Sequence, residues 1–497
     1  MKFFNGGYMN KTVNSNSKEL LPIVKNTVVC DLDVEGRIVC VNAVSEVKST
    51  EALNKELRIS LVTSFRVVTC GEDGEYELTV RRAESVASVT DENLSPAVKS
   101  VVCVNVADCS YVEKEGGRAT AELEITGWYL KTNELNFLTE PKESVFCRTG
   151  KYDIENVASV EEYSVTLTNS NEARLPIKKI LDCSTVVVVN NVYPAAGTFQ
   201  LDGDVITRII AVSDSGIFVT QTFTSPFTTE INSESVTADS VIDVYPKVTR
   251  TDLTVTETDE RVFITDVDVK FLYAVSEKCE IDGIIDCYST ANELTVEEAI
   301  NVVNTCSCFR SVRDKCSATV KSENVIEEVL CVNAPYISDV SASVDGGLKV
   351  EGLITSVVLF TDESGLKTEK CVVPFSTAVT SDYDCRDTFL PDVKITSLSA
   401  RIRSATEIEV VAEICVSVRG VNKHEIKLVS SIETGAEKPA AEYAISLYIV
   451  KPGETIWDVS KALNTDEDTV FRLNPELSLP LKGGEKIIIY NELVFDI

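Results

Sequence analysis

The chain has 497 residues, of which 44% are hydrophobic, and this length and composition predict about three globular domains with packed cores. Asp and Glu outnumber Lys and Arg by 78 to 47, which gives a net charge of −31. An acidic chain without a basic cluster is unlike a nucleic-acid-binding protein, and the same charge disfavours anionic membrane surfaces.

The N-terminus gives the first indication of where the protein works. The residues from Met1 to Gly7 lack the apolar stretch of a secretion signal. No run of about 18 uncharged apolar residues occurs anywhere, so we expect no membrane insertion. The sequence therefore favours a cytoplasmic protein with an N-terminal tail over residues 1–18. A cell-envelope location is the alternative, and it needs an export route that the sequence does not reveal.

The chain has 16 cysteines. Cysteine makes up about 3% of its residues, far below the fraction in small proteins held together by disulfides. Most lie in apolar strand patterns, so we expect reduced, packed thiols. A denser group comprises Cys279, Cys287, Cys306, Cys308, Cys316 and Cys331. We interpret this group as packing, with cross-linking between chains as the alternative. A metal site is disfavoured because no Cys-x-x-Cys pair occurs and the single histidine, His424, is far away. We predict no cofactor.

Three segments share one pattern, which predicts a repeated all-β unit. They cover residues 57–130, 199–273 and 348–418, and each has alternating apolar residues rich in Val, Ile and Thr. A tight turn follows the first strand of each segment, with the turn glycines Gly74, Gly216 and Gly365. These glycines recur about every 145 residues, as repeated copies of one supersecondary unit would.

We therefore expect a mainly β protein of three antiparallel β-sandwich-like repeats followed by a small βααβ domain. After the tail, the expected domains are a first repeat (19–150), a second repeat (151–290), a third repeat with its preceding linker (291–438) and a C-terminal domain (439–497). The segment from Val296 to Val303 is compatible with either a helix or a strand. Two repeats carry a Pro-Phe step that the first lacks: Pro226-Phe227 and Pro374-Phe375.

The C-terminal residues predict a strand, two short helices and a closing strand. Tyr448 and Val450 alternate as in a strand. Thr455 is a suitable N-cap for a helix whose apolar face is Ile456, Val459, Ala462 and Leu463. The second helix is expected to end at Pro475, and Gly483-Gly484 then turns the chain into an apolar strand.

This order, with the run Tyr-Ile-Val-Lys-Pro-Gly-Glu-Thr-Ile-Trp that ends at Trp457, resembles a LysM domain. Glu454 and Ile456 replace the Asp and Leu usual in that family. The resemblance implies a groove for N-acetylglucosamine glycans between two loops, formed by Gly453, Glu454, Thr455, Ile456, Asn474, Pro475, Glu476 and Leu477. The same residues also have a structural interpretation, in which the loops only make turns and Ile456 fills the core. We expect Trp457 in the core.

The repeats resemble the sporulation-associated domain of unknown function in clostridial spore-morphogenesis proteins of the SipL type. The resembling residues include the run from Val350 to Ile354, the turn at Gly365 and the Pro374-Phe375-Ser376 step. Three repeats followed by one LysM domain also match that architecture, although the first repeat departs most. The resemblance implies a protein of the mother-cell cytoplasm, at the forespore surface, that docks through its LysM domain to a coat-morphogenetic ATPase or another coat protein.

No catalytic constellation is apparent, because one histidine leaves no His-based triad and no Gly-x-x-x-x-Gly-Lys phosphate loop occurs. We therefore predict a non-enzymatic scaffold of spore-coat assembly with protein partners. The alternative is a cell-envelope protein that binds peptidoglycan or a related glycan, and an enzyme with its site in the repeats is a third, less favoured hypothesis. The sequence leaves the arrangement of the repeats and the oligomeric state open.

Overall fold

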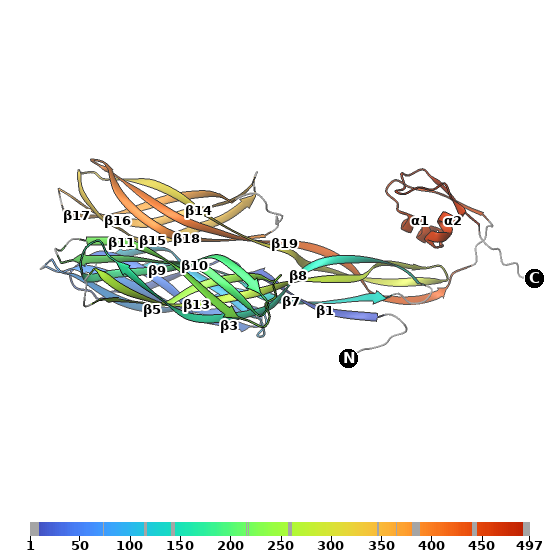
Figure 1. The fold of residues 1–497 in the computed structure, drawn as a ribbon, viewed down its shortest axis with the longest axis horizontal. Coiled ribbons are helices and arrows are strands. Elements are labelled where there is room, and N and C mark those ends of the chain that lie inside the picture. Colours follow the sequence, from blue (N-terminus) through green and yellow to red (C-terminus); the bar gives the residue numbers. More distant parts are fainter. Residues whose placement is uncertain are drawn as a thin grey trace, which may run out of the picture.

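The structure is a computed structural model, which describes residues 9–72, 74–113, 117–140, 145–214, 216, 218–256, 261–344, 347–363, 365–379, 388–439 and 445–490. Figure 1 shows an elongated molecule, in which a broad body of long strands narrows into an arm. Two short helices lie beside the far end of that arm. The chain is mainly β, as the sequence predicts.

The strands follow one another along the chain with short connections. The first third contains β1 (Met9–Leu20), β2 (Val24–Asp31), β3 (Arg37–Leu53), β4 (Glu56–Cys70), β5 (Tyr76–Thr90), β6 (Ser100–Val112) and β7 (Arg118–Glu140). The second third contains β8 (Val145–Glu172), β9 (Ile177–Ala195), β10 (Thr198–Ser213), β11 (Phe218–Asn232), β12 (Val241–Val255) and β13 (Val262–Ser289).

The last third ends in a separate small module. Its body strands are β14 (Asn292–Lys321), β15 (Ile326–Val344), β16 (Leu348–Asp362), β17 (Gly365–Val379), β18 (Thr388–Ser404) and β19 (Glu407–Glu437). The C-terminal module consists of β20 (Ile445–Ile449), α1 (Ile456–Leu463), α2 (Glu467–Leu473) and β21 (Lys486–Tyr490).

Each third builds two antiparallel sheets in a common order. In the second third, β9, β10 and β11 form one sheet, and β13 pairs with β8 and β12 in the other. The last third repeats this with β15, β16 and β17, and with β19 between β14 and β18. In the first third, β1 and β2 lie one after the other along β7, where β8 and β14 are continuous in the later copies. Pro22 lies at this break and has no N–H to donate to a ladder.

Three sequence expectations differ from the observed elements. Residues 9–18, expected in a tail, belong to β1, which pairs with β7 along its whole length. The expected boundary at residue 150 falls inside β8, which pairs with β13 on both sides of it. Val296 to Val303 is part of strand β14, because pairing with β19 supplies its backbone hydrogen bonds. In each case a partner distant in sequence decides the structure.

The predicted turn glycines occupy the conformation that their type favours. Gly74, Gly216 and Gly365 have φ angles of 78°, 77° and 103°. They lie at the connections from β4 to β5, β10 to β11 and β16 to β17. This left-handed region is open to glycine at little cost, so the sequence signal for these turns is confirmed.

The Pro-Phe step is explained by a glycine on the neighbouring strand. Phe227 lies opposite Gly203, and Phe375 lies opposite Gly352. A Cβ atom at either glycine would come within 2.6 Å of the facing ring, so these rings occupy the space that a side chain would fill. In the first third, Leu61 and a serine face each other at this place. The first copy therefore lacks both the ring and the glycine that accommodates it.

The two sheets of each third share an apolar core. Phe65 of β4 is buried with Leu123 of β7, and Phe199 of β10 is buried with Phe271 of β13. In the last third, Phe360 of β16 is buried with Val416 of β19. Because alternate side chains of a strand point to one face, a strict apolar alternation in both sheets is enough to build each core.

Side chains from all three thirds meet within the body. Val68, Ile210 and Leu359, from β4, β10 and β16, belong to one buried cluster. A second junction is ionic: Asp243 of β12 pairs with Lys18 of β1 and with Arg419 of β19. These contacts join the thirds into a single body.

The arm is formed by the ends of three two-stranded ribbons: β1 with β7, β8 with β13, and β14 with β19. Its buried residues come from each ribbon and include Leu135, Phe137, Ile154, Ile281, Val303, Ile426 and Leu428. Gly283 of β13 allows this packing, because a Cβ atom there would lie 2.8 Å from the Phe137 ring and 2.9 Å from Leu428. The arm thus has its own core and carries the C-terminal module at its far end (Figure 1).

The cysteines whose side chains are described are all free thiols. In the dense group, Cys279 and Cys287 lie on β13, Cys316 on β14 and Cys331 on β15, while the side chains of Cys306 and Cys308 lie outside the described part. Cys287 faces Cys147 directly across β13 and β8, a pairing that sequence spacing did not indicate.

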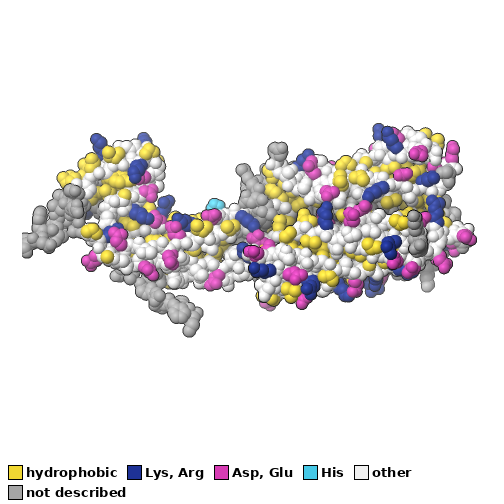
Figure 2. Space-filling view, turned by 180° about the vertical axis from the view of Figure 1, so that it is seen from behind, with side chains coloured by type: hydrophobic (Ala, Val, Ile, Leu, Met, Phe, Trp, Pro, Cys, Tyr) yellow, Lys and Arg dark blue, Asp and Glu magenta, His cyan; other side chains and the backbone are white. Residues whose placement is uncertain are grey.

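Figure 2 shows the face opposite to that of Figure 1, where acidic and basic side chains intermingle.

Candidate functional site

The C-terminal module forms through local signals in its sequence. Thr455 is the N-cap of α1, as predicted, and makes a capping box with Asp458: the Thr455 backbone N–H donates to the Asp458 carboxylate at 2.8 Å. Asp466 caps α2 by accepting from the Thr469 N–H at 2.7 Å. β20 and β21 pair antiparallel and pack against both helices through the residues Val450, Val459, Val470, Ile487 and Ile489. The strand–helix–helix–strand order of the sequence prediction is confirmed.

Asn474, predicted in the groove, holds the module together. Its side chain is only 2% exposed. The Nδ2 atom donates to the carbonyl oxygens of Val470 and Ile488 at 2.8 and 3.0 Å, and Oδ1 accepts from the Ile488 N–H at 2.8 Å. Asn474 thereby joins the end of α2 to β21. With these bonds made and no exposed surface, the side chain is not positioned to contact a ligand.

Glu454 also has a structural task. Its carboxylate accepts from the Tyr448 hydroxyl and from the Lys451 N–H, both at 2.8 Å. These bonds close the loop in which Gly453 has a φ of 87°. Glu454 therefore stabilises the turn, and the loop is fixed before any ligand arrives.

The other predicted groove residues remain accessible on two loops. Gly453, Thr455, Pro475 and Glu476 are exposed. Ile456 and Leu477 are half-buried at the edge of the module's core. The two loops thus offer apolar edges beside exposed backbone, a combination that suits the apolar and hydrogen-bonding faces of a sugar.

The comparisons with known proteins agree with this geometry. Residues 448–489 match the family model of the LysM domain. A LysM domain is found here. No match to the chain was found among the curated proteins or among the solved structures. The resemblance of the repeats to a sporulation family is thus without support from these comparisons.

Trp457 does not lie in the core of the LysM domain, so that prediction was wrong. Its ring leaves the α1 surface and meets the arm: Nε1 donates to Asp286 Oδ2 at 2.7 Å. The apolar face of α1 is otherwise formed by Ile456, Val459 and Leu463, while Ala462 is exposed, contrary to expectation. Trp457 is an anchoring residue, and its partner lies 171 residues earlier in the chain.

A set of polar contacts fixes the LysM domain on the end of β13. Lys461 Nζ donates to Asp286 Oδ1 at 2.6 Å, so this carboxylate accepts from two residues of α1. Asn464 Nδ2 donates to the Thr290 carbonyl at 2.8 Å, and the Tyr288 hydroxyl donates to the Thr465 carbonyl at 2.8 Å. Burial would raise the pKa of Asp286, but the hydrogen bonds from Lys461 and Trp457 outweigh it and lower the pKa. The anchor therefore favours the charged carboxylate.

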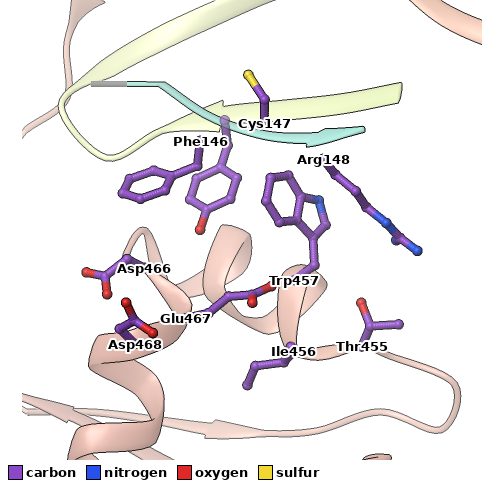
Figure 3. A pocket seen from close by; sticks show the side chains of 10 residues that line it. Phe146, Cys147, Arg148, Thr455, Ile456, Trp457, Asp466, Glu467 and Asp468 are labelled. Atoms are coloured by element: carbon purple, nitrogen blue, oxygen red, sulfur yellow. The ribbon is translucent and has the colours of Figure 1, made fainter. Parts of the chain in front are cut away.

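Aromatic rings continue the contact on the same face of the arm. Phe146 of β8 and Tyr288 of β13 lie opposite each other and stack with ring centroids 5.2 Å apart. The Tyr288 ring meets Trp457 edge-on at 4.9 Å. Figure 3 shows Phe146 pointing toward the helices, whereas Cys147 points away, as strand alternation requires.

A cleft of about 540 Å³ opens between the LysM domain and the arm. Its lining residues are Phe146, Cys147, Arg148, Tyr288, Thr455, Ile456, Trp457, Asp466, Glu467 and Asp468. Thr455 and Ile456 belong both to this cleft and to the predicted groove. The sequence indicated neither the cleft nor its arm residues, because nothing local marks β8 and β13 as neighbours of α1.

In the described part of the chain, no helix is long and apolar enough to cross a membrane. Among the same residues, no group of three or more His, Cys, Asp or Glu side chains is arranged to hold a metal ion. His424 is exposed on β19, in agreement with the polar stretch around it.

Replacing Asp286 with alanine is expected to release the LysM domain from the arm, because Trp457 and Lys461 lose a shared acceptor. Each lost charge-assisted bond is worth about 1 kcal/mol at this partly exposed site. The released domain should show red-shifted Trp457 emission, measured with Trp128 replaced by phenylalanine, and a larger radius of gyration in solution scattering. The control is Asp282→Ala, since Asp282 is half-exposed on the same strand and its carboxylate lies 3.9 Å from Lys151. Equal emission and equal radii for the two variants would contradict this anchor.

Proposed function

We propose that this protein is a non-enzymatic binding scaffold, in which three sandwich-like β repeats hold a LysM domain whose groove takes a glycan containing N-acetylglucosamine. The observation that carries the proposal is the division of the LysM surface. Trp457, Lys461 and Asn464 anchor it to the arm. The loops at Gly453–Ile456 and Pro475–Leu477 stay accessible. The anchor therefore presents the groove without covering it.

The chemistry of the two loops suits an acetylated amino sugar. Half-buried Ile456 and Leu477 offer apolar surface for the acetamido methyl group and the C–H face of a sugar ring. Gly453 has no side chain and Pro475 has a compact ring, so a ligand can approach the backbone at both positions. The charge of the chain opposes strongly anionic ligands, so a neutral N-acetylglucosamine oligomer is favoured over teichoic or nucleic acid.

The test is sedimentation of the full chain with purified bacterial sacculi. Ile456→Asp should reduce the pelleted fraction at least tenfold at a subsaturating amount of sacculi. The bound sugar would shield the new carboxylate from water, and burying an unpaired charge costs binding free energy. The matched control is Ile300→Asp on β14, where the isoleucine is 62% exposed and does not line the cleft beside the groove. Circular dichroism must show that both variants are folded. Undiminished pelleting of Ile456→Asp would contradict the groove assignment.

A second candidate function is docking to another protein, and one feature favours it. The outer face of the two-stranded sheet carries exposed apolar side chains: Ile445, Leu447, Ile449, Ile488 and Tyr490. β20 and β21 bring these side chains together in register, with Leu447 opposite Ile488 and Ile445 opposite Tyr490. A contiguous exposed apolar face of this kind is typical of a protein interface. In this proposal the partner is a spore-coat protein, such as a coat-morphogenetic ATPase, in the mother-cell cytoplasm.

The same experiment separates the two functions. If the folded wild-type chain does not pellet with sacculi, the glycan proposal fails and protein docking is favoured. If it pellets through Ile456, the envelope location becomes the one to pursue.

A further inference from the structure

The cleft beside the LysM domain is continuous with the proposed glycan groove. Thr455 and Ile456 border both, so a sugar bound against these two residues would lie at the edge of the cleft. The volume of about 540 Å³ is within the range of small-molecule sites. One wall comes from α1 and α2, and the other from β8 and β13, so the cleft exists only when the LysM domain is anchored (Figure 3).

Aromatic rings form the arm side of this cleft. Phe146 is 37% exposed while its ring stacks on Tyr288, which is only 4% exposed. Tyr288 is in turn held by Trp457 and by its bond to the Thr465 carbonyl. The accessible Phe146 ring is therefore fixed in place. A fixed ring attracts the C–H face of a sugar and, more strongly, a cationic group.

Carboxylates form the opposite side. Glu467 and Asp468, in the first turn of α2, make no hydrogen bond or ion pair with any residue that the structure describes. Asp466 lies beside them, and Arg148 is the basic residue of the lining. Burial and then the charges of Glu467 and Asp466 raise the pKa of Tyr288 to about 12. With three carboxylates and one guanidinium in its lining, the cleft carries a net negative charge.

We propose that this cleft is a second sugar subsite, which takes an amino sugar with a free, protonated C2 amine, next to the acetylated residues in the groove. The inference rests on the proposed glycan function. An ammonium group carries donors and positive charge, whereas Glu467 and Asp468 carry only acceptors and negative charge. The ammonium can also lie near the face of Phe146. An acetamido group lacks the charge, and a sugar acid would be repelled.

The test is titration calorimetry of the full chain at low ionic strength, under conditions that keep the sugar amine protonated. The probes are the tetramer of N-acetylglucosamine and the two tetramers with one free amine at either terminal residue. One of these two should bind about tenfold tighter than the fully acetylated tetramer. Glu467→Gln should remove this advantage, because it removes a charge that the ammonium group meets. Phe146→Ala should weaken binding of the free-amine tetramer and, to a smaller extent, of the acetylated one, because the ring packs against either sugar.

The control is Glu369→Gln, an equal charge change at an exposed position on β17. It should keep the advantage of the free amine. If both tetramers with a free amine bind no tighter than the acetylated one, or if Glu467→Gln leaves the advantage intact, the second subsite is overturned. If the acetylated tetramer does not bind, or if Ile456→Asp leaves its binding unchanged, the groove itself fails. The two failures are therefore distinguishable.

Discussion

Replacing Asp243 with asparagine is expected to destabilise the body by about 3–5 kcal/mol. Asp243 is buried, and its carboxylate pairs with Lys18 and with Arg419, whose Nε lies 3.1 Å away. The three residues come from the three thirds of the chain, and each side chain is less than a tenth exposed. Asparagine would remove the carboxylate charge with which both buried cations pair. This cost is far greater than that of breaking an ion pair in water.

The effect should depend on pH in a defined direction. Burial by itself would raise the pKa of Asp243, but the charges of Lys18 and Arg419 outweigh it and lower the pKa. A carboxyl with a lowered pKa adds stability above its unfolded value, near pH 4, and loses it as the pH falls through the folded value. The difference between wild type and Asp243→Asn should therefore be full at neutral pH and shrink below about pH 4.

Urea unfolding followed by circular dichroism measures this difference, since the body supplies nearly all of the strand signal. The control is Asp31→Asn, because Asp31 pairs with Arg118 at 2.8 Å while both side chains are more than 60% exposed. An exposed pair contributes about 0–1 kcal/mol, so this variant should unfold almost like wild type. If Asp243→Asn does the same, the ionic junction does not hold the three thirds together.

Replacing Asn474 with alanine is expected to destabilise the LysM domain by about 2–4 kcal/mol. The change would leave the Ile488 N–H and the carbonyls of Val470 and Ile488 without this partner. A domain of this size has a folding free energy of only a few kcal/mol, so a large unfolded fraction should result. Loss of glycan binding in this variant would follow from loss of fold.

The measurement is backbone amide hydrogen exchange at β21 and α2, compared with the body strands. Glu476→Ala is the control, because Glu476 is exposed on the same loop. Exchange should accelerate strongly in β21 of Asn474→Ala and remain as in wild type for Glu476→Ala. Unchanged protection of β21 in Asn474→Ala would return Asn474 to the candidate ligand contacts.

The LysM domain could be predicted from the sequence because its signals are local. Thr455 and Asp458 cap a helix three residues apart, and Gly453 permits the turn before it. The turn glycines of the body are also a local signal. Gly74 and its two counterparts mark turns because a positive φ angle at one residue favours glycine. Regular alternation likewise predicted the strands, since the period of a strand is a property of consecutive residues.

The candidate site was predictable only in part. The groove on the two loops stays a prediction, and the roles of Asn474 and Glu454 depend on bonds that spacing does not reveal. Trp457 was expected in the core because a large aromatic residue beside an apolar helix face is usually buried there. Its actual environment is supplied by Asp286 and Tyr288, from a strand far away in the chain.

The sequence by itself determined the β character of the body, the turns at its glycines and the LysM fold, because each follows from residues close together along the chain. The tertiary structure decided that β1 is a strand, that the ends of three ribbons form an arm, and that a cleft lies between Phe146 and Glu467. These features arise where segments more than a hundred residues apart come together. Their partners are selected by packing and charge in three dimensions, for which the order of residues carries no local signal.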